Sequence, residues 1–137
     1  MGKKAEQALA KLLAERDETL RALLDTSDED CHKKVPWYGR ETTVGHMFRN
    51  FTSHELDHFQ HLHRLMQARG QKLTEAHLLF MKAQAALAEF QIMALGLSDE
   101  EFERPGPNEG DWSAAQVVEH VIDQERFYRE AILKAHD

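Results

Sequence analysis

The segment Phe51–Leu65, FTSHELDHFQHLHRL, brings four histidines and two carboxylates into a short stretch of the chain. Such groups bind transition metals, transfer protons, or lie in solvent on a helix surface. His54 and His58 are four residues apart, so on a helix they project from one face. Their imidazoles could then reach a single ion, because Zn–N bonds are only about 2.0–2.1 Å long. The spacing therefore predicts part of a metal site.

The apolar residues around this pair favour a helix that runs from about Thr43 to Ala68. At 100° per residue they fall on one stripe. His58 lies inside that stripe, Glu55 lies near its middle and His54 lies on its border. We expect all three to face the interior of a helical protein or the mouth of that interior.

The other histidines carry weaker signals. His61 lies on the opposite border of the stripe and stays ambiguous. His120 is the only histidine between Ala114 and Ala135 and lies on the border of the apolar side of its own helix. The remaining histidines are predicted to be solvated surface residues: His32, His46, His63, His77 and His136.

A third ligand would complete the site, and His120 is the candidate. His54, His58 and His120 could bind one side of a divalent ion and leave other positions open to water or substrate. Three neutral imidazoles suit Zn²⁺, Ni²⁺ or Fe²⁺. Glu55 is the candidate catalytic residue. It could accept a proton from a metal-bound water or thiol, orient an imidazole, or simply form an ion pair with a neighbouring arginine.

Two other metal motifs fit less well. HELDH matches the H-E-x-x-H pattern of zincin proteases, but Asp57 places a charge where those helices are usually apolar. ELDH also matches the E-x-x-H pattern of di-iron bundles. That site needs the motif on a second helix, where Tyr128 occupies the position of the second histidine. The three-histidine site is therefore the preferred interpretation.

The apolar spacing predicts four amphipathic helices and no strand, hence an all-α protein. A four-helix bundle buries four such stripes most simply. We expect a single domain, residues 1–137. The first helix should end near Asp25, and the second should begin after a cap at Thr42 or Thr43. The predicted helices are about Lys4–Asp25, Thr43–Ala68, Thr74–Leu95 and Ala114–His136.

The chain also repeats itself. When 42–58 is placed beside 112–128, Thr43 falls on Ser113, His54 on Gln124 and Glu55 on Glu125. The preceding loops, LDTSDEDCHKKVP and LGLSDEEFERPGP, each place a leucine before Ser-Asp-Glu and end on proline. These matches predict a duplicated helix–loop–helix unit, so that the bundle would consist of two similar halves.

Composition restricts the partners. The 137 residues carry a formal net charge of −7, and an acidic chain repels the phosphates of nucleic acids. The single cysteine, Cys31, excludes an intramolecular disulfide and suits the cytoplasm. No uninterrupted apolar run approaches the roughly 20 residues that cross a bilayer, so no membrane span is expected. A small-molecule substrate is the expected partner, and Trp37 and Tyr38 could line its pocket or simply pack in the loop.

Three segments carry a family resemblance. They are WSAAQVVEH at Trp112–His120, TVGHMFRNFTSHELDH at Thr43–His58, and the lead-in LSDEEFERPGPNEGDWS. In combination they resemble the DinB-like superfamily over nearly the whole chain. The resemblance implies a four-helix bundle, often a homodimer, that binds one divalent metal through His54, His58 and His120. Two features depart from the family: the Trp-Ser half comes second here, and Asn50 stands where a further histidine is frequent.

The resemblance also implies a class of activity. Characterised relatives are metal-dependent thiol (S-)transferases or isomerases that use low-molecular-weight thiols on small electrophiles. An open metal site suits this chemistry, because it binds a thiol as the thiolate. Two alternatives stay open. The protein could be a non-catalytic metal- or small-molecule-binding stress-response protein, or a purely structural bundle whose histidines lie at its mouth.

Overall fold

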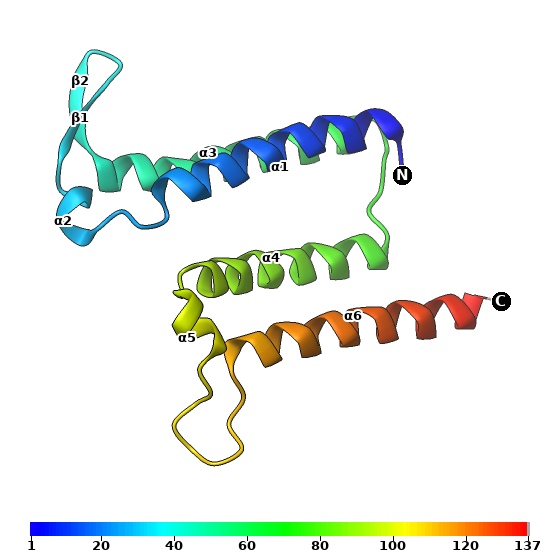
Figure 1. The fold of residues 1–137 in the computed structure, drawn as a ribbon. Helices are drawn as coiled ribbons and strands as arrows, with labels where there is room; N and C mark the ends of the chain where they lie inside the picture. The colour runs from blue at the N-terminus through cyan, green and yellow to red at the C-terminus, as the bar shows by residue number, and fades with distance from the viewer. Residues whose placement is uncertain (137) are drawn as a thin grey trace. The chain divides into compact units, whose positions relative to one another are not determined.

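The computed structural model describes residues 1–136, which form six helices and one two-stranded sheet (Figure 1). The chain divides into two compact units, Met1–Leu78 and Leu79–Asp137. The predicted all-α character is broadly confirmed. The elements are α1 Lys3–Leu23, α2 Asp28–Cys31, β1 Lys34–Trp37, β2 Arg40–Thr43, α3 Val44–Ala68, α4 Glu75–Leu95, α5 Asp99–Glu103 and α6 Ala114–His136.

The long helices α3 and α6 begin where the sequence places their caps. The Thr43 hydroxyl accepts a hydrogen bond from the backbone N–H of His46 at 3.2 Å. Ser113 accepts from the backbone N–H of Gln116 at 3.2 Å, and the Gln116 side chain accepts from the Ser113 N–H at 2.9 Å. The free donors at the start of α3 and α6 are thereby partly satisfied. Past the end of α3, Gly70 adopts a positive φ of 66°, which favours glycine.

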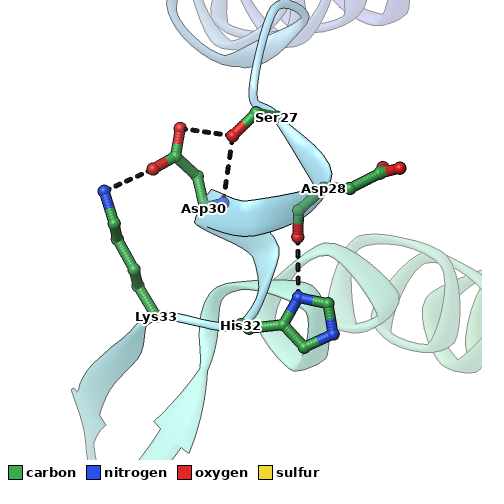
Figure 2. Close-up of polar contacts among 5 residues, drawn as sticks. All are labelled: Ser27, Asp28, Asp30, His32 and Lys33. Carbon is green, nitrogen blue, oxygen red and sulfur yellow. Dashed lines mark hydrogen bonds and ion pairs between the residues drawn. The ribbon is translucent and has the colours of Figure 1, made fainter.

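The apolar spacing does not predict the short helix α2, although Ser27 belongs to the repeated Ser-Asp-Glu segment. Figure 2 shows the Ser27 hydroxyl accepting from the Asp30 backbone N–H at 3.0 Å and bonding to the Asp30 carboxylate at 2.9 Å. The Lys33 ammonium forms an ion pair with the same carboxylate. Hydrogen bonds from Lys33 and then Ser27 lower the pKa of Asp30. The His32 ring also bonds to the Asp28 carbonyl at 2.7 Å, so local contacts close this loop.

The second unit repeats this arrangement. Ser98 caps α5 by accepting from the Glu101 backbone N–H at 3.2 Å, while the Glu101 side chain accepts from the Ser98 N–H at 2.9 Å. In each unit a long helix leads to a serine-capped short helix, then to an extended pairing that includes the next cap. The pairing joins Lys34 to Thr43 in the first unit and Pro105 to Ser113 in the second. The local structures therefore agree with the predicted duplication.

The prediction of no strand was wrong. Strands β1 and β2 pair antiparallel through a two-residue turn at Tyr38 and Gly39. Both turn residues have positive φ, 46° and 73°, as a type I′ turn requires. The usual sequence signals for this turn are Asn-Gly and Asp-Gly. Because the turn here is Tyr-Gly, the sequence gives no clear signal for the hairpin.

The predicted apolar stripes are present, but neither unit by itself encloses a core. Over residues 1–136 no hydrophobic side chain is buried, and Ser113, 5% exposed, is the only buried residue. Within the second unit α4 and α6 share a small apolar groove of about 210 Å³, lined by residues such as Phe90 and Val117. Packing of four helices into one bundle therefore stays a prediction.

Helix α4 also bears on the membrane expectation. Among the described residues it is the one helix that is long and apolar enough, by length and composition alone, to cross a membrane. Its apolar residues do not form an uninterrupted run, because Glu75, Lys82 and Glu89 lie among them. A core helix of a soluble protein meets the same criterion.

Candidate functional site

The histidine pair of α3 is the best-formed part of the candidate site. His54 and His58 lie one helical turn apart, and their Nε2 atoms are 3.1 Å from each other. The ring centroids are 4.4 Å apart and the ring planes meet at 67°. Both residues are exposed within their unit rather than enclosed. In a hydrogen bond of this kind one neutral imidazole donates and the other accepts.

This separation fits shared coordination of one ion. Two bonds of about 2.0–2.1 Å to nitrogen atoms 3.1 Å apart enclose an angle of about 95–102°. That angle lies between the octahedral and the tetrahedral values. The pair is therefore compatible with a first-row divalent ion. Neither unit by itself, over residues 1–136, gathers three histidine, cysteine or carboxylate side chains for such an ion.

The predicted third ligand, His120, belongs to the second unit. It lies on α6, and its ring packs edge-on against the indole of Trp112, with centroids 5.1 Å apart. Trp112 immediately precedes the buried cap Ser113, so the start of α6 fixes the indole beside its second turn. The structure thus gives His120 an aromatic neighbour that the sequence reading did not predict. Convergence of His120 with the α3 pair stays a prediction.

Glu55 forms an ion pair with Arg16, which joins α3 to α1 within the first unit. The Arg16 guanidinium also lies over the Phe51 ring, 5.5 Å from its centroid. The two charged side chains are 39% and 58% exposed, so water screens them and the pair contributes at most about 1 kcal/mol. An ion pair with an arginine is one of the three roles that the sequence leaves open for Glu55. The sequence does not predict that Arg16 is this partner, because Arg16 and Glu55 are 39 positions apart.

A groove of about 580 Å³ lies next to the pair in the first unit. Trp37 of the hairpin lines it, which agrees with the suggested pocket role. Tyr38 does not line it and is 93% exposed. The lining residues are Leu23, Trp37, Met47, Asn50, Phe51, Ser53, His54, Glu55 and Asp57.

His46 corrects the surface-histidine prediction. It is half-buried, and its ring stacks at an angle on Trp37 with centroids 5.3 Å apart. The contact arises because the hairpin folds its Trp37 back toward the first turn of α3. The other four histidines predicted to be on the surface are exposed: His32, His63, His77 and His136. His61 is exposed as well, 6.2 Å from His58 between ring centroids.

Comparisons of the chain with protein-family models, with curated proteins and with solved structures found no match. The DinB-like resemblance therefore rests on the chain's own motifs. Those motifs include two helix caps and the histidine pair.

Proposed function

We propose that this chain is a DinB-like four-helix-bundle protein of the cytoplasm that binds one divalent ion through His54, His58 and His120. The observation that carries the proposal is the 3.1 Å separation of the His54 and His58 Nε2 atoms. Zn²⁺, Ni²⁺ and Fe²⁺ all accept such ligands. The apolar pattern adds support, because His120 lies on the border of the apolar stripe of its helix, as His54 does on its own.

We infer further that the site serves transfer of a low-molecular-weight thiol to a small electrophile, or a related isomerisation. When bound, the ion supplies Lewis acidity that favours the thiolate form of the thiol. The chain's own groups do the rest. His54 and His58 hold the ion, the groove beside His54 receives the apolar part of the electrophile, and Glu55 accepts the thiol proton through its carboxylate.

A second candidate is a stress-response protein that binds a metal or small molecule without turnover. The ion pair between Arg16 and Glu55 favours it, because a carboxylate held by a guanidinium is less free to approach a thiol proton. A homodimer suits either candidate. Exposed leucines along α1 and α4 offer apolar faces for a second copy, among them Leu12 and Leu79, 61% and 63% exposed.

Elemental analysis of the purified protein tests metal binding. Wild-type protein should hold about one divalent ion per chain, and His58→Ala should hold little. His63→Ala is the matched control, because His63 lies on the same helix and is not part of the pair. Wild-type protein that stays metal-free after growth with added metal would remove the proposal's basis.

Transfer assays then separate the two candidates. Metal-loaded protein is mixed with chloro-dinitrobenzene and, in turn, glutathione, bacillithiol, mycothiol or coenzyme A. Transfer that is lost in His58→Ala and kept in His63→Ala supports the enzyme. One bound ion without transfer from any of the four thiols favours the binding protein.

A further inference from the structure

The groove beside His54, which the proposed function assigns to the apolar part of the electrophile, also carries charged residues. Its apolar wall consists of Leu23, Trp37, Met47 and Phe51, contributed by α1, the hairpin and α3. Its volume of about 580 Å³ is in the range of small-molecule sites. Two aromatic rings in that wall give a ligand flat surfaces to pack against.

The charges of the groove have one sign. Glu55 and Asp57 are both in the lining, and none of the described lining residues is a lysine or an arginine. Arg16 pairs with Glu55 and also lies over the Phe51 ring of the groove wall, so its charge is already matched within the protein. No cation pairs with Asp57 among residues 1–136. With one carboxylate neutralised and one left over, the groove repels anions.

Phe51 of the groove wall already has a cationic neighbour, the protein's own Arg16. The Arg16 guanidinium already lies 5.5 Å from the Phe51 centroid, within the distance at which a ring face attracts a positive charge. Trp37 presents a second ring of the better type for such contacts. The groove therefore combines an apolar wall, against which a ligand can pack, with the unpaired negative charge of Asp57 among the described residues.

We propose that this groove binds a molecule with an apolar or aromatic body and a positively charged amine, with Asp57 as the counter-charge. The inference rests on the proposed function for its meaning, because His54 is part of the groove and the molecule would be the electrophile presented to the bound thiol. It narrows that function, since it excludes carboxylic-acid electrophiles. The alternative is a negatively charged ligand that pairs with Arg16 in place of Glu55.

Three ligands of nearly equal size test the sign of the charge. They are phenethylamine, phenylacetamide and phenylacetate, titrated into the full chain with chelator present. The readout is the indole N–H signal of Trp37 in a proton–nitrogen spectrum, distinguished from the only other tryptophan by Trp37→Phe. We expect the amine to bind about 3- to 10-fold more tightly than the amide and the acid to bind most weakly, as a desolvated cation–π contact and one counter-charge allow.

Variants identify the groups responsible. Asp57→Asn should remove the preference for the amine and leave the affinity for phenylacetamide unchanged. Asp17→Asn, an exposed carboxylate of α1 outside the groove, is the matched control and should change nothing. Arg16→Gln should strengthen amine binding. Tightest binding of phenylacetate, lost in Arg16→Gln, would overturn the proposal, and so would equal affinities for all three ligands.

His58→Ala separates this inference from the proposed function, because His58 is not part of the groove lining. If the metal site exists, the variant loses the ion and keeps the preference for the amine. An amine preference in a wild-type protein that never binds metal supports the groove and contradicts the proposed function. One ion per chain without any charge preference contradicts the groove alone.

Discussion

Metal binding should raise the thermal stability of this protein by an amount that can be calculated. An ion that binds only the folded state, at a free concentration 100 times its Kd, stabilises by about 2.7 kcal/mol. Unfolding entropies average about 2.1 cal/mol/K per residue, or roughly 290 cal/mol/K for 137 residues. The quotient is a rise in Tm of about 9 °C.

His58→Ala should abolish that rise without unfolding the protein. His58 is exposed, and its bond to His54 is a single neutral hydrogen bond worth about 1 kcal/mol at most. Alanine is the better helix former by roughly 0.5 kcal/mol and offsets part of this loss. Without metal, the Tm of His58→Ala should therefore lie within about 3–4 °C of the Tm of metal-free wild type. His63→Ala should keep the full rise.

Differential scanning calorimetry with zinc or nickel, and then with excess chelator, measures these shifts. An ion shared by His54 and His58 requires a large shift in wild type and in His63→Ala, and none in His58→Ala. Chelator-insensitive melting of wild type would refute the metal site. Equal shifts in all three proteins would show that the ion binds elsewhere.

Four further outcomes are expected. Glu55→Gln should lower the unfolding free energy by about 0.2–1 kcal/mol in urea through loss of the Arg16 pair, and should retain the ion while abolishing thiol transfer; weaker metal binding would instead indicate an orienting role. Ser113→Ala should cost about 1–2 kcal/mol in urea, because this cap is buried and reciprocated. The backbone N–H of Ser98 lowers the pKa of Glu101, so this cap stabilises α5 above the ordinary pKa of glutamate and its contribution is lost as the pH falls through the lowered value. The Ser98 amide signal should therefore titrate with a midpoint below the ordinary pKa of glutamate, and a midpoint at or above that pKa would contradict the contact. Light scattering at tens of micromolar should give twice the chain mass of 15.8 kDa, whereas a monomer alone would contradict the apolar-face dimer.

Local sequence signals predicted the long helices well because their causes are local. An apolar residue every three or four positions needs a helix to form one face. A serine or threonine just before such a run satisfies the free N–H groups at the helix start. Thr43 and Ser113 do this in the structure as their positions predict. Hence α3 and α6 begin within a residue of where their caps place them.

The hairpin and the side-chain contacts of Glu55 and His46 are harder to predict from the sequence. Each strand has only four residues, and its turn uses Tyr38 in a left-handed conformation that bulky residues rarely adopt. The contact between Arg16 and Glu55 joins residues far apart in sequence, and the stacking of His46 on Trp37 depends on the hairpin. Periodicity marks which face of a helix is apolar. It does not say what covers that face, and neither unit covers it by itself.

The duplication explains why one ion, and not two, is expected per chain. Counted from the caps Thr43 and Ser113, three positions recur on α3 and α6. They hold Asn50, His54 and His58 on α3, and His120, Gln124 and Tyr128 on α6. A site takes the last two of these positions from one helix and the first from the other. Only His54 and His58 of α3 together with His120 of α6 give three histidines.

The opposite combination would unite Asn50 with Gln124 and Tyr128. An amide pair and a phenol are poor ligands for Zn²⁺, Ni²⁺ or Fe²⁺, since they offer no imidazole or thiolate. The local fold is thus shared by the two units, while the metal-binding chemistry is not. The two copies together have six equivalent positions, three on α3 and three on α6. One metal site requires histidine at only three of these six positions. The presence of His54 and His58 on α3, where α6 has Gln124 and Tyr128, is therefore the reason we expect one ion per chain.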